Sequence, residues 1–416
     1  MAPCRSLIFR ASDMTQRFIP EHTGEVAAVV REARQERVRL EVVAGGSRRG
    51  YGRAVDADAV LDVSRLAGVI DYDPAELVLT ARPATPMSEI AALLAGEGQH
   101  LAFEPGDQGP LWGAPAGSGT LGGMLAYGLG GPRRPTAGAP RDHFLGFEAV
   151  NGFGDIFSAG GKVIKNVTGY DLPKLLAGSM GTLAVLTEVT VKALPAPPHA
   201  VTLGLEGLTI AGAVRAMSDA LNSPAGVSGA AYLPRGHAAI DDKPLTLLRL
   251  EGVPVSVSER VDHLRGLLAT TSSRISLLES SAATALWADL AAVHPFAEKD
   301  DEIVWRVSLP PSTASAFLSA LPQAVEARWF CDWGGGLIWL FLPPNEDGHA
   351  ATMRAVLAQV AGRDGHATLM RAPEEIRRVQ SPFQPLEAGL AALSVRVKER
   401  FDPDGILNPG RLYGSL

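Results

Sequence analysis

Residues 45–52 read GGSRRGYG and follow directly on the apolar run LEVVA at residues 40–44. The apolar run predicts a buried strand, and a strand that enters a glycine-rich loop exposes backbone N–H groups to an anion. Glycine lacks a Cβ atom, so a phosphate can approach such a backbone closely. Arg48 and Arg49 add positive charge in a planar geometry that suits phosphate. The stretch therefore favours a phosphate-bearing ligand, and a plain surface turn with solvated arginines is the alternative.

The sequence has 416 residues, of which 46% are hydrophobic and 20% are charged. This length and composition are typical of a globular protein with two or three domains. The formal net charge of -7 argues against nucleic-acid binding, because domains with that function are usually basic. No apolar run reaches the roughly 18 residues that a membrane helix needs, so we expect no direct membrane insertion.

The two cysteines, Cys4 and Cys331, form no CxxC pattern, so this chain alone cannot build an iron–sulfur cluster or a cysteine zinc site. The nine histidines show no HxH or HExxH cluster, and no metal site is expected. Few cysteines and no clear secretory signal favour the cytoplasm, with any attachment to the inner face of the membrane made through partners. Residues 1–14 are expected to be a tail or a mis-assigned start, since Met14 is an alternative first residue.

Strand and helix patterns alternate over residues 15–198, which predicts a first domain of the α/β or α+β class. The proline-rich PAPP at 195–198 marks its end. Over residues 199–372, two similar β-α-β patterns predict a second domain with an antiparallel sheet and helices on one face. Within it, the runs RWFCDW and LIWLFL, joined by three glycines, predict a β-hairpin. Residues 373–416 are expected to form a helix followed by a proline-punctuated tail.

Glycine and proline dominate residues 104–140, and a loop of this length inside a compact domain is usually functional. The GSGTLG at 117–122 matches GxGxxG, and Asp142 follows twenty residues after it. It does not sit between a strand and a helix of one βαβ unit, so a Rossmann site is rejected, and no Walker A pattern occurs. Two glycine-rich loops, at 45–52 and 115–131, predict one elongated crevice that suits a dinucleotide such as FAD.

Four segments in this order resemble the FAD-binding oxidoreductases of the vanillyl-alcohol-oxidase type, and among them the FAD-binding (E) subunits of bacterial glycolate oxidases. The segments are GGSRRGYGR at 45–53, GTLGGMLAYGLGGPRRPTAGAPRDHFLG at 119–146, KVIKNVTGYDLPKLLAGSMGTLAVLTEVTVKALP at 162–195 and RFDPDGILNPGRLY at 400–413. The resemblance implies an α+β fold: a two-part FAD-binding domain of the PCMH type at 15–198, an α/β cap domain with an antiparallel sheet at 199–372, and a tail at 373–416 that returns to the FAD domain.

The resemblance also implies which residues hold FAD, with the first glycine loop on the pyrophosphate and the second along the flavin and ribityl chain. The implied cofactor-binding residues are Gly45, Gly46, Ser47, Arg49, Gly50, Tyr51, Ser118, Gly119, Thr120, Gly122, Gly123, Asp142, Lys165, Asn166, Gly169, Tyr170, Asp171, Gly181, Thr182, Leu183, Val185 and Leu186.

Two departures from the family pattern qualify this assignment. Relatives with covalently bound flavin often carry a histidine in the first loop, where this chain has Ser47, so FAD is expected to bind non-covalently. Many relatives read GSEGTLG where this chain has Met180 and Ala184 in place of the glutamate and the second glycine, so no carboxylate role is assigned there.

The catalytic residues are left open, because each candidate has a simpler structural explanation. Arg133 or Arg134 could hold a substrate carboxylate, but binding to FAD phosphates or to a partner explains them as well. Tyr170, Lys165 and His143 could assist proton transfer, but a packed tyrosine, a lysine paired with a backbone carbonyl or cofactor oxygen, and a structural histidine are the simpler explanations. A further candidate is the cap segment His294-Pro295-Phe296, which could face the flavin.

Three functional hypotheses follow. In the first, the chain oxidises glycolate or a similar small 2-hydroxy acid and passes the electrons to a partner subunit. In the second, it carries FAD as an electron relay or supporting subunit while a sister flavin subunit oxidises the substrate. In both, the resemblance implies a complex with a sister FAD subunit and an iron–sulfur subunit. In the third, the chain binds another nucleotide without redox chemistry, which the missing Walker and Rossmann contexts disfavour.

Overall fold

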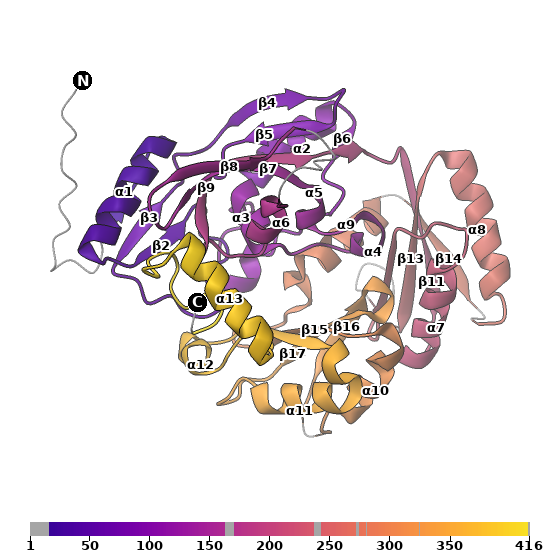
Figure 1. The fold of residues 1–416 in the computed structure, drawn as a ribbon. Coiled ribbons are helices and arrows are strands. Elements are labelled where there is room, and N and C mark those ends of the chain that lie inside the picture. Colours follow the sequence, from indigo (N-terminus) through magenta and orange to yellow (C-terminus); the bar gives the residue numbers. More distant parts are fainter. Residues whose placement is uncertain are drawn as a thin grey trace.

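The computed structural model describes residues 16–162, 170–236, 243–271, 274–279, 281–323 and 325–414. Figure 1 shows two bodies side by side, the first built from the N-terminal half and the second from the segments that follow β10. The C-terminal helix, in yellow, returns to lie against the first body. The molecule therefore contains mixed helices and sheets with the chain crossing twice between the two bodies.

The first body begins with a small parallel sheet covered by one helix. Its strands, in the order β1-β3-β2, are β1 (Arg17–Phe18), β3 (Ala59–Asp62) and β2 (Leu40–Val43), and its helix is α1 (Thr23–Glu36). The apolar residues Val26, Val29, Val30 and Ala33 of α1 are buried. They pack in one cluster with Leu40 and Leu61 of the two long strands, so this core fixes the end of β2 from which the first glycine loop departs.

A second sheet of the first body is antiparallel, in the order β4-β5-β9-β7-β8. Its strands are β4 (Val69–Asp73), β5 (Val78–Ala81), β9 (Ala184–Lys192), β7 (Phe144–Asn151) and β8 (Ile156–Gly160). The adjoining short elements are α2 (Met87–Gly96), β6 (Gln99–His100), η1 (Gly109–Trp112), α3 (Leu121–Tyr127), α4 (Arg134–Ala137), α5 (Pro140–His143), α6 (Leu172–Leu176) and β10 (Leu194–Pro195).

The helix α2 begins at Met87 with Pro86 at its N-cap, so the Thr85 side chain just before it is free for other contacts. The Thr85 hydroxyl instead donates to the Arg82 carbonyl at 2.7 Å and accepts from the Gly68 N–H at 2.9 Å. The threonine therefore holds two turns together rather than capping the helix.

The second body is built on an antiparallel sheet of eight described strands, in the order β14-β11-β13-β12-β16-β17-β15-β18. The strands are β14 (Ile275–Glu279), β11 (His199–Glu206), β13 (Leu245–Gly252), β12 (Gly229–Leu233), β16 (Arg328–Asp332), β17 (Leu337–Leu342), β15 (Ile303–Ser308) and β18 (His366–Arg371). The helical segments are α7 (Ile210–Leu221), α8 (Pro254–Leu268), α9 (Ser281–Ala292), η2 (His294–Phe296), η3 (Pro311–Thr313), α10 (Ala314–Ala320), η4 (Trp333–Gly335), α11 (Ala350–Ala361) and η5 (Gly362–Asp364).

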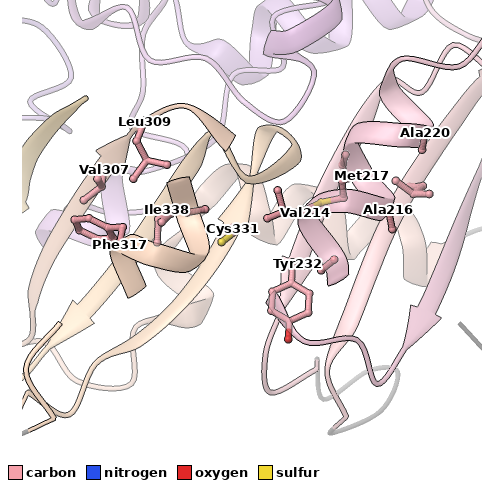
Figure 2. Packing of buried hydrophobic residues seen from close by; sticks show 14 of the residues in the cluster. Val214, Ala216, Met217, Ala220, Tyr232, Val307, Leu309, Phe317, Cys331 and Ile338 are labelled. Atoms are coloured by element: carbon pink, nitrogen blue, oxygen red, sulfur yellow. The ribbon is translucent and has the colours of Figure 1, made fainter. Parts of the chain in front are cut away.

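The two faces of this sheet have different partners. On one face, α7, α8, α10 and α11 pack on the sheet in a single apolar core, and Figure 2 shows Val214 and Met217 of α7 near Cys331 of β16. On the other face, Phe330 and Trp339 pack with Tyr51 and Met180 of the first body. The antiparallel sheet and the β16–β17 hairpin were both predicted, and both are present. The prediction that the helices lie on one face is wrong for α9, whose Leu286 and Leu290 pack on the other face.

The C-terminal segment consists of α12 (Glu374–Val379), α13 (Ala388–Phe401) and a tail that lies against the first body. Leu407 forms a parallel bridge with Leu40 of β2, and the Asn408 N–H donates to the Leu40 carbonyl at 2.9 Å. The tail thus extends the small sheet beside the first glycine loop.

Candidate functional site

The main cleft lies in the first body, where three segments meet around the C-terminal end of β2. It measures about 790 Å³ with its open mouth included. Its described lining comprises Val42, Val43, Ala44, Gly45, Gly46, Ser47, Arg48, Arg49, Val63, Pro83, Thr120, Gly122, Gly123, Ala126, Tyr127, Leu176, Ser179, Met180, Gly181, Ala184, Val185, Leu186 and Asn408. The two glycine-rich loops predicted to line one crevice therefore do so.

Close backbone contact explains why the walls of the cleft carry glycine. A Cβ atom on Gly45 would lie 2.1 Å from the Ser118 carbonyl oxygen, and one on Gly122 would lie 2.4 Å from the Pro83 side chain. Gly181 has a φ of +71°, and a Cβ there would lie 2.8 Å from the Asn408 side chain. The three segments are therefore packed so tightly that only glycine fits, which leaves backbone groups open to a ligand.

Arg48 is the charged group inside this cleft. The side chain is 4% exposed and its Nε has no hydrogen-bond partner. Its guanidinium makes a 3.4 Å hydrogen bond to Ser47 Oγ, contacts Met124 Sδ at 3.9 Å and lies 5.9 Å from the Tyr127 ring centroid. Burial lowers the pKa of Arg48, with Tyr127 and Asp107 acting in the opposite direction. An orphaned donor on a buried cation is a costly arrangement unless an anion completes it.

Arg49, which was predicted to bind the cofactor, is already paired with Glu41. Its Nε donates to Glu41 at 2.8 Å, and it is partly exposed on the rim of the cleft. The hydrogen bond to Glu41 raises the pKa of Arg49, because the carboxylate stabilises the charged form. Of the two adjacent arginines, Arg48 is the one with unused hydrogen-bonding capacity in the cleft.

A second, larger cleft of about 1410 Å³, again with its open mouth included, adjoins the first through Arg48, which lines both. Its walls come from α2, the β6 segment and the second glycine-rich loop, including Gly119 and Asp107. A guanidinium nitrogen of Arg48 lies 3.9 Å from the position that a Cβ of Gly119 would take. The two clefts therefore form an extended track with a positive charge at their junction.

The C-terminal tail fixes the loop that carries Arg48. Arg411 donates to the carbonyls of Arg48 and Arg49, at 2.8 Å and 3.0 Å, and to the Tyr127 hydroxyl at 3.0 Å. Asn408 accepts from the Val42 N–H at 2.8 Å and donates to the Met180 carbonyl at 2.7 Å. The NPGR of the fourth sequence segment thus ties two walls of the cleft together, although no local sequence pattern indicates that Asn408 lies in the lining itself.

The structure divides the predicted cofactor residues into two groups. Those that line the main cleft are Gly45, Gly46, Ser47, Arg49, Thr120, Gly122, Gly123, Gly181, Val185 and Leu186, while Gly119 lines the adjoining one. Those that line neither are Gly50, Tyr51, Ser118, Asp142, Tyr170, Asp171, Thr182 and Leu183. Lys165, Asn166 and Gly169 lie outside the described residues.

Aromatic packing explains why Gly50 and Tyr51 line neither cleft. Tyr51 is buried among Trp112, Tyr127 and Phe383, with its ring centroid 5.6 to 5.7 Å from each of theirs. Gly50 allows Trp112 to approach, since a Cβ atom there would lie 2.8 Å from its ring.

Three further residues hold local structure. Ser118 donates to the Pro115 carbonyl at 2.6 Å, and its own carbonyl faces Gly45. Thr182 donates to the Ser179 carbonyl at 2.7 Å. Leu183 packs in the core of the five-stranded sheet.

Tyr170 and Asp171, which follow the undescribed residues 163–169, line neither cleft. Tyr170 is 93% exposed, so the structure gives no proton-transfer partner for it. Asp171 caps α6 by accepting from the Lys174 N–H and pairs with the Lys174 ammonium at 2.8 Å. Asp142 accepts from the Ala139 N–H at 2.9 Å and lines a separate small pocket with Arg134.

The histidine and arginine candidates take different positions. His143 is 2% exposed, with Nε2 2.8 Å from the Ala137 carbonyl and its ring against Phe103, so it is a packed residue. Arg133 is committed to Glu251 and Glu104 in ion pairs of 2.6 Å and 3.2 Å.

The cap candidate His294-Pro295-Phe296 also packs within the second body. Phe296 of the His294–Phe296 segment packs on Phe330 and lines a hollow of the second body, not the cofactor cleft.

Within the described ranges, no helix is both long and apolar enough to cross a membrane. The same part of the chain contains no group of three or more histidine, cysteine, aspartate or glutamate side chains arranged to hold a metal ion.

The fold and the cleft together define a class of protein. A two-part α+β body with glycine-lined clefts, an antiparallel cap sheet and a returning C-terminal tail is the arrangement of the PCMH-type FAD-binding oxidoreductases. Two solved structures share it over most of their length. An alkyldihydroxyacetonephosphate synthase matches with a TM-score of 0.69 at 17% identity, over 94% of this chain and 76% of its own. A 4-ethylphenol oxidase from Gulosibacter chungangensis matches with a TM-score of 0.69 at 14% identity, over 95% and 88%.

Sequence comparison places the chain within this class. Residues 15–160 match the family model described as FAD binding domain. The glycolate oxidase subunit GlcE of Escherichia coli (strain K12) is 35% identical over 93% of this chain and 96% of its own length. The glycolate oxidase subunit GlcD of Bacillus subtilis (strain 168) is 24% identical over 95% and 88%. The chain therefore belongs to the family of FAD-linked oxidoreductases that includes GlcE, and its cofactor is FAD.

Proposed function

We propose that FAD binds non-covalently along the two adjoining clefts, with its phosphates against the first glycine loop and Arg48. The main support is that Nε of the buried Arg48 has no hydrogen-bond partner, beside cleft walls where only glycine fits. An FAD pyrophosphate supplies the anion that this arginine lacks. Ser47 occupies the loop position expected to be histidine in covalent relatives, which supports non-covalent binding. The described lining of the main cleft contains no histidine or cysteine, and the adjoining cleft is lined by one histidine, His100.

We further propose that the chain is a subunit of a glycolate oxidase complex that oxidises glycolate or a similar small 2-hydroxy acid. Its 35% identity to GlcE over nearly the whole chain supports this function. Bound flavin supplies a hydride acceptor for the α-carbon of such a substrate. The sequence contains no CxxC, so the electrons leave to a partner, for which a sister FAD subunit and an iron–sulfur subunit are the proposed candidates.

A second role remains a candidate because of a specific observation. None of the predicted acid–base candidates within the described residues lies in the main cleft: His143 is packed and Tyr170 faces solvent. This favours, as the alternative, an FAD-carrying relay or supporting subunit whose sister subunit oxidises the substrate.

The first experiment is a visible spectrum of the purified chain, recorded before and after acid precipitation. Flavin bands that move into the supernatant are expected for non-covalent FAD. Anaerobic glycolate then separates the two roles, since bleaching of the flavin places substrate oxidation in this chain, and an unbleached flavin favours the relay role. A chain that binds no flavin, even after incubation with FAD, would contradict both.

Substitution of the two loop arginines tests the placement of the phosphates. We expect Arg48→Met to weaken FAD binding about 10- to 100-fold, because a charge-assisted hydrogen bond to phosphate contributes roughly 1.5–3 kcal/mol. Arg49→Met is the matched control and should change FAD affinity less than threefold, since Arg49 is already paired with Glu41. Fluorescence titration of the apoprotein with FAD measures both, and equal losses in the two variants would contradict the assignment to Arg48.

A further inference from the structure

A closed ring of four alternating charges joins the two bodies. Arg133 and Glu104 belong to the first body, and Arg249 and Glu251 belong to β13 of the second body, the cap. Two ion pairs cross between the bodies, Arg133 with Glu251 at 2.6 Å and Arg249 with Glu104 at 2.7 Å. Two more lie within one body each, Arg133 with Glu104 at 3.2 Å and Arg249 with Glu251 at 3.5 Å. The ring can therefore close only when the cap is docked.

The residue pattern of β13 explains why two charges of the cap face the first body. Side chains of the strand at 245–252 alternate between the two faces of the sheet. Leu248 packs in the core under the helices, whereas Leu247 packs in the cluster that the cap shares with the first body. Arg249 and Glu251 continue the row of Leu247, so the apolar side of this strand ends in two charges at the interface.

The four side chains of the ring are largely shielded from water. Their exposed fractions are 17% for Arg133, 9% for Glu251, 4% for Arg249 and 16% for Glu104. Burial raises the pKa of Glu251, but the hydrogen bond from Arg133 and the charges of both arginines outweigh burial and bring the pKa to about 2. Removal of one member therefore leaves a buried charge without its partner.

On the first body, the ring holds one wall of the second cleft. Glu104 and Arg133 line that cleft, whereas Arg249 and Glu251 are not among the described residues that line either cleft. The Glu104 backbone is left-handed, with a φ of +53°, and its carbonyl oxygen lies 2.1 Å from the position that a Cβ of Gly131 would take. A left-handed conformation is uncommon for glutamate, and surrounding contacts must hold it in place.

The same wall continues from Glu104 to the second glycine-rich loop. Asp107 accepts from the Gly117 N–H at 2.7 Å, and both residues line the second cleft. The cap touches this stretch again, since a Cβ on Gly106 would lie 2.0 Å from the Ala291 carbonyl oxygen of α9. A shift of the cap would therefore move the wall of the cleft.

We propose that the ring is a latch between the two bodies, and that Arg249 and Glu251 are positioning residues through which the docked cap shapes the second cleft. Resting on the proposed function, the ligand of that cleft is FAD. The closed latch then favours FAD binding, and bound FAD favours the closed latch by the same factor. A network that only held the fold together would change the stability of the free and the FAD-loaded chain alike, and it would leave the FAD affinity unchanged.

The test compares Arg249→Met with the wild type by fluorescence titration of the apoproteins with FAD. We expect the dissociation constant to rise at least about fivefold, as for ordinary coupling between sites. Arg249→Lys keeps the charge and should lose less, while Glu251→Gln breaks the other crossing and should also weaken binding. These two milder changes carry the comparison if Arg249→Met does not fold. Amide hydrogen exchange at residues 104–108 should be faster in Arg249→Met, because the wall of the cleft is released.

Arg328→Met is the matched control. Arg328 of the cap also pairs with a buried carboxylate, Glu302 at 2.6 Å, and also lies over an aromatic ring, but these contacts stay within the cap. Its loss should lower the melting temperature without changing FAD affinity or the exchange of residues 104–108. Unchanged FAD affinity in both Arg249→Met and Glu251→Gln would overturn the proposal, as would an equal loss in Arg328→Met. A wild-type chain that binds no FAD would instead contradict the proposed function.

Discussion

Single glycines decide whether the cofactor cleft can exist, because three chain segments meet there without room for a side chain. The ideal Cβ of Gly45 lies 2.1 Å from the backbone carbonyl oxygen of Ser118, which cannot rotate away as a flexible side chain would. The sequence identified this loop through its glycine content alone. It could not show which neighbouring atom demands glycine, because Ser118 is 73 residues distant in the chain.

The expected result of Gly45→Ala is a loss of FAD binding together with a lower melting temperature, since one of the two loops must move. Overpacking of this kind typically costs about 1–3 kcal/mol. Gly96→Ala is the control: Gly96 lies in α2 with nothing near its ideal Cβ, and alanine there should stabilise by roughly 0.5–1 kcal/mol. Thermal unfolding with and without FAD measures both, and an unaltered Gly45→Ala protein would show that the loops can separate freely.

The two loop arginines show that a local sequence pattern does not reveal which charged side chain enters a site. Arg48 and Arg49 are neighbours with identical local patterns, yet one points into the cleft and the other pairs with Glu41 on the strand before the loop. The direction of a side chain in a turn depends on backbone conformation and on tertiary partners such as Arg411, which holds both carbonyls. No local pattern carries that information.

Among the elements, α13 and the tail after it pack against the first body and are held there by buried hydrogen bonds. Lys398, near the end of α13, is buried and donates to the carbonyls of Thr182 and Leu407, at 2.6 Å and 3.0 Å, and to Asp402 at 2.7 Å. Asp402 in turn accepts from the N–H groups of Ile406 and Leu407. This network sets the course of the chain into Asn408, which lines the cofactor cleft.

We expect Lys398→Met to lower the free energy of unfolding by about 3–5 kcal/mol, because it leaves Asp402 as an uncompensated buried charge. FAD affinity should fall as well, since Asn408 and Arg411 follow on the same tail. The double variant Lys398→Met/Asp402→Asn should recover part of the stability, because the stranded charge is gone. Urea unfolding of all three proteins provides the measurement, and a double variant no more stable than the single one would show that the buried charge is not the cause.

The elements themselves were largely predictable, and their long-range pairings were not. The β16–β17 hairpin and the antiparallel cap sheet follow from strand patterns and turn residues that lie close together in the chain. By contrast, Arg133 was interpreted as a possible anion ligand, and it is instead paired with Glu251 of the cap. Such a contact joins residues 118 positions apart, so it becomes visible only when both bodies are assembled.

For the whole molecule, the interface between the two bodies is apolar but contains buried charges. The Glu104 carboxylate of the first body pairs with Arg249 of the cap, while Asp332 of β16 is 2% exposed beside them. Burial raises the pKa of Asp332 to about 7, with Glu104 also raising it and with Arg249 and Arg306 opposing the shift. The folded protein therefore retains a proton on Asp332 at a pH where the unfolded chain has lost it.

The sign of the pH dependence follows from this difference. Between about pH 4 and pH 7 the folded state binds more protons at Asp332, so the contribution of this carboxyl to the free energy of unfolding falls as the pH rises, by at most about 4 kcal/mol. Asp332→Asn removes the ionisable group, so the advantage of this variant over the wild type should grow from pH 5 to pH 8 and then level off. Urea unfolding of the FAD-loaded proteins across this range measures the difference.

Asp300→Asn, at an exposed aspartate of the same body, controls for the loss of one negative charge and should track the wild type. If Asp332→Asn also tracked the wild type at every pH, Asp332 would be ionised in the folded state throughout, and Arg249 and Arg306 would have to neutralise it. The pH series thus tests whether burial of Asp332 outweighs the two guanidinium groups beside it at the interface between the bodies.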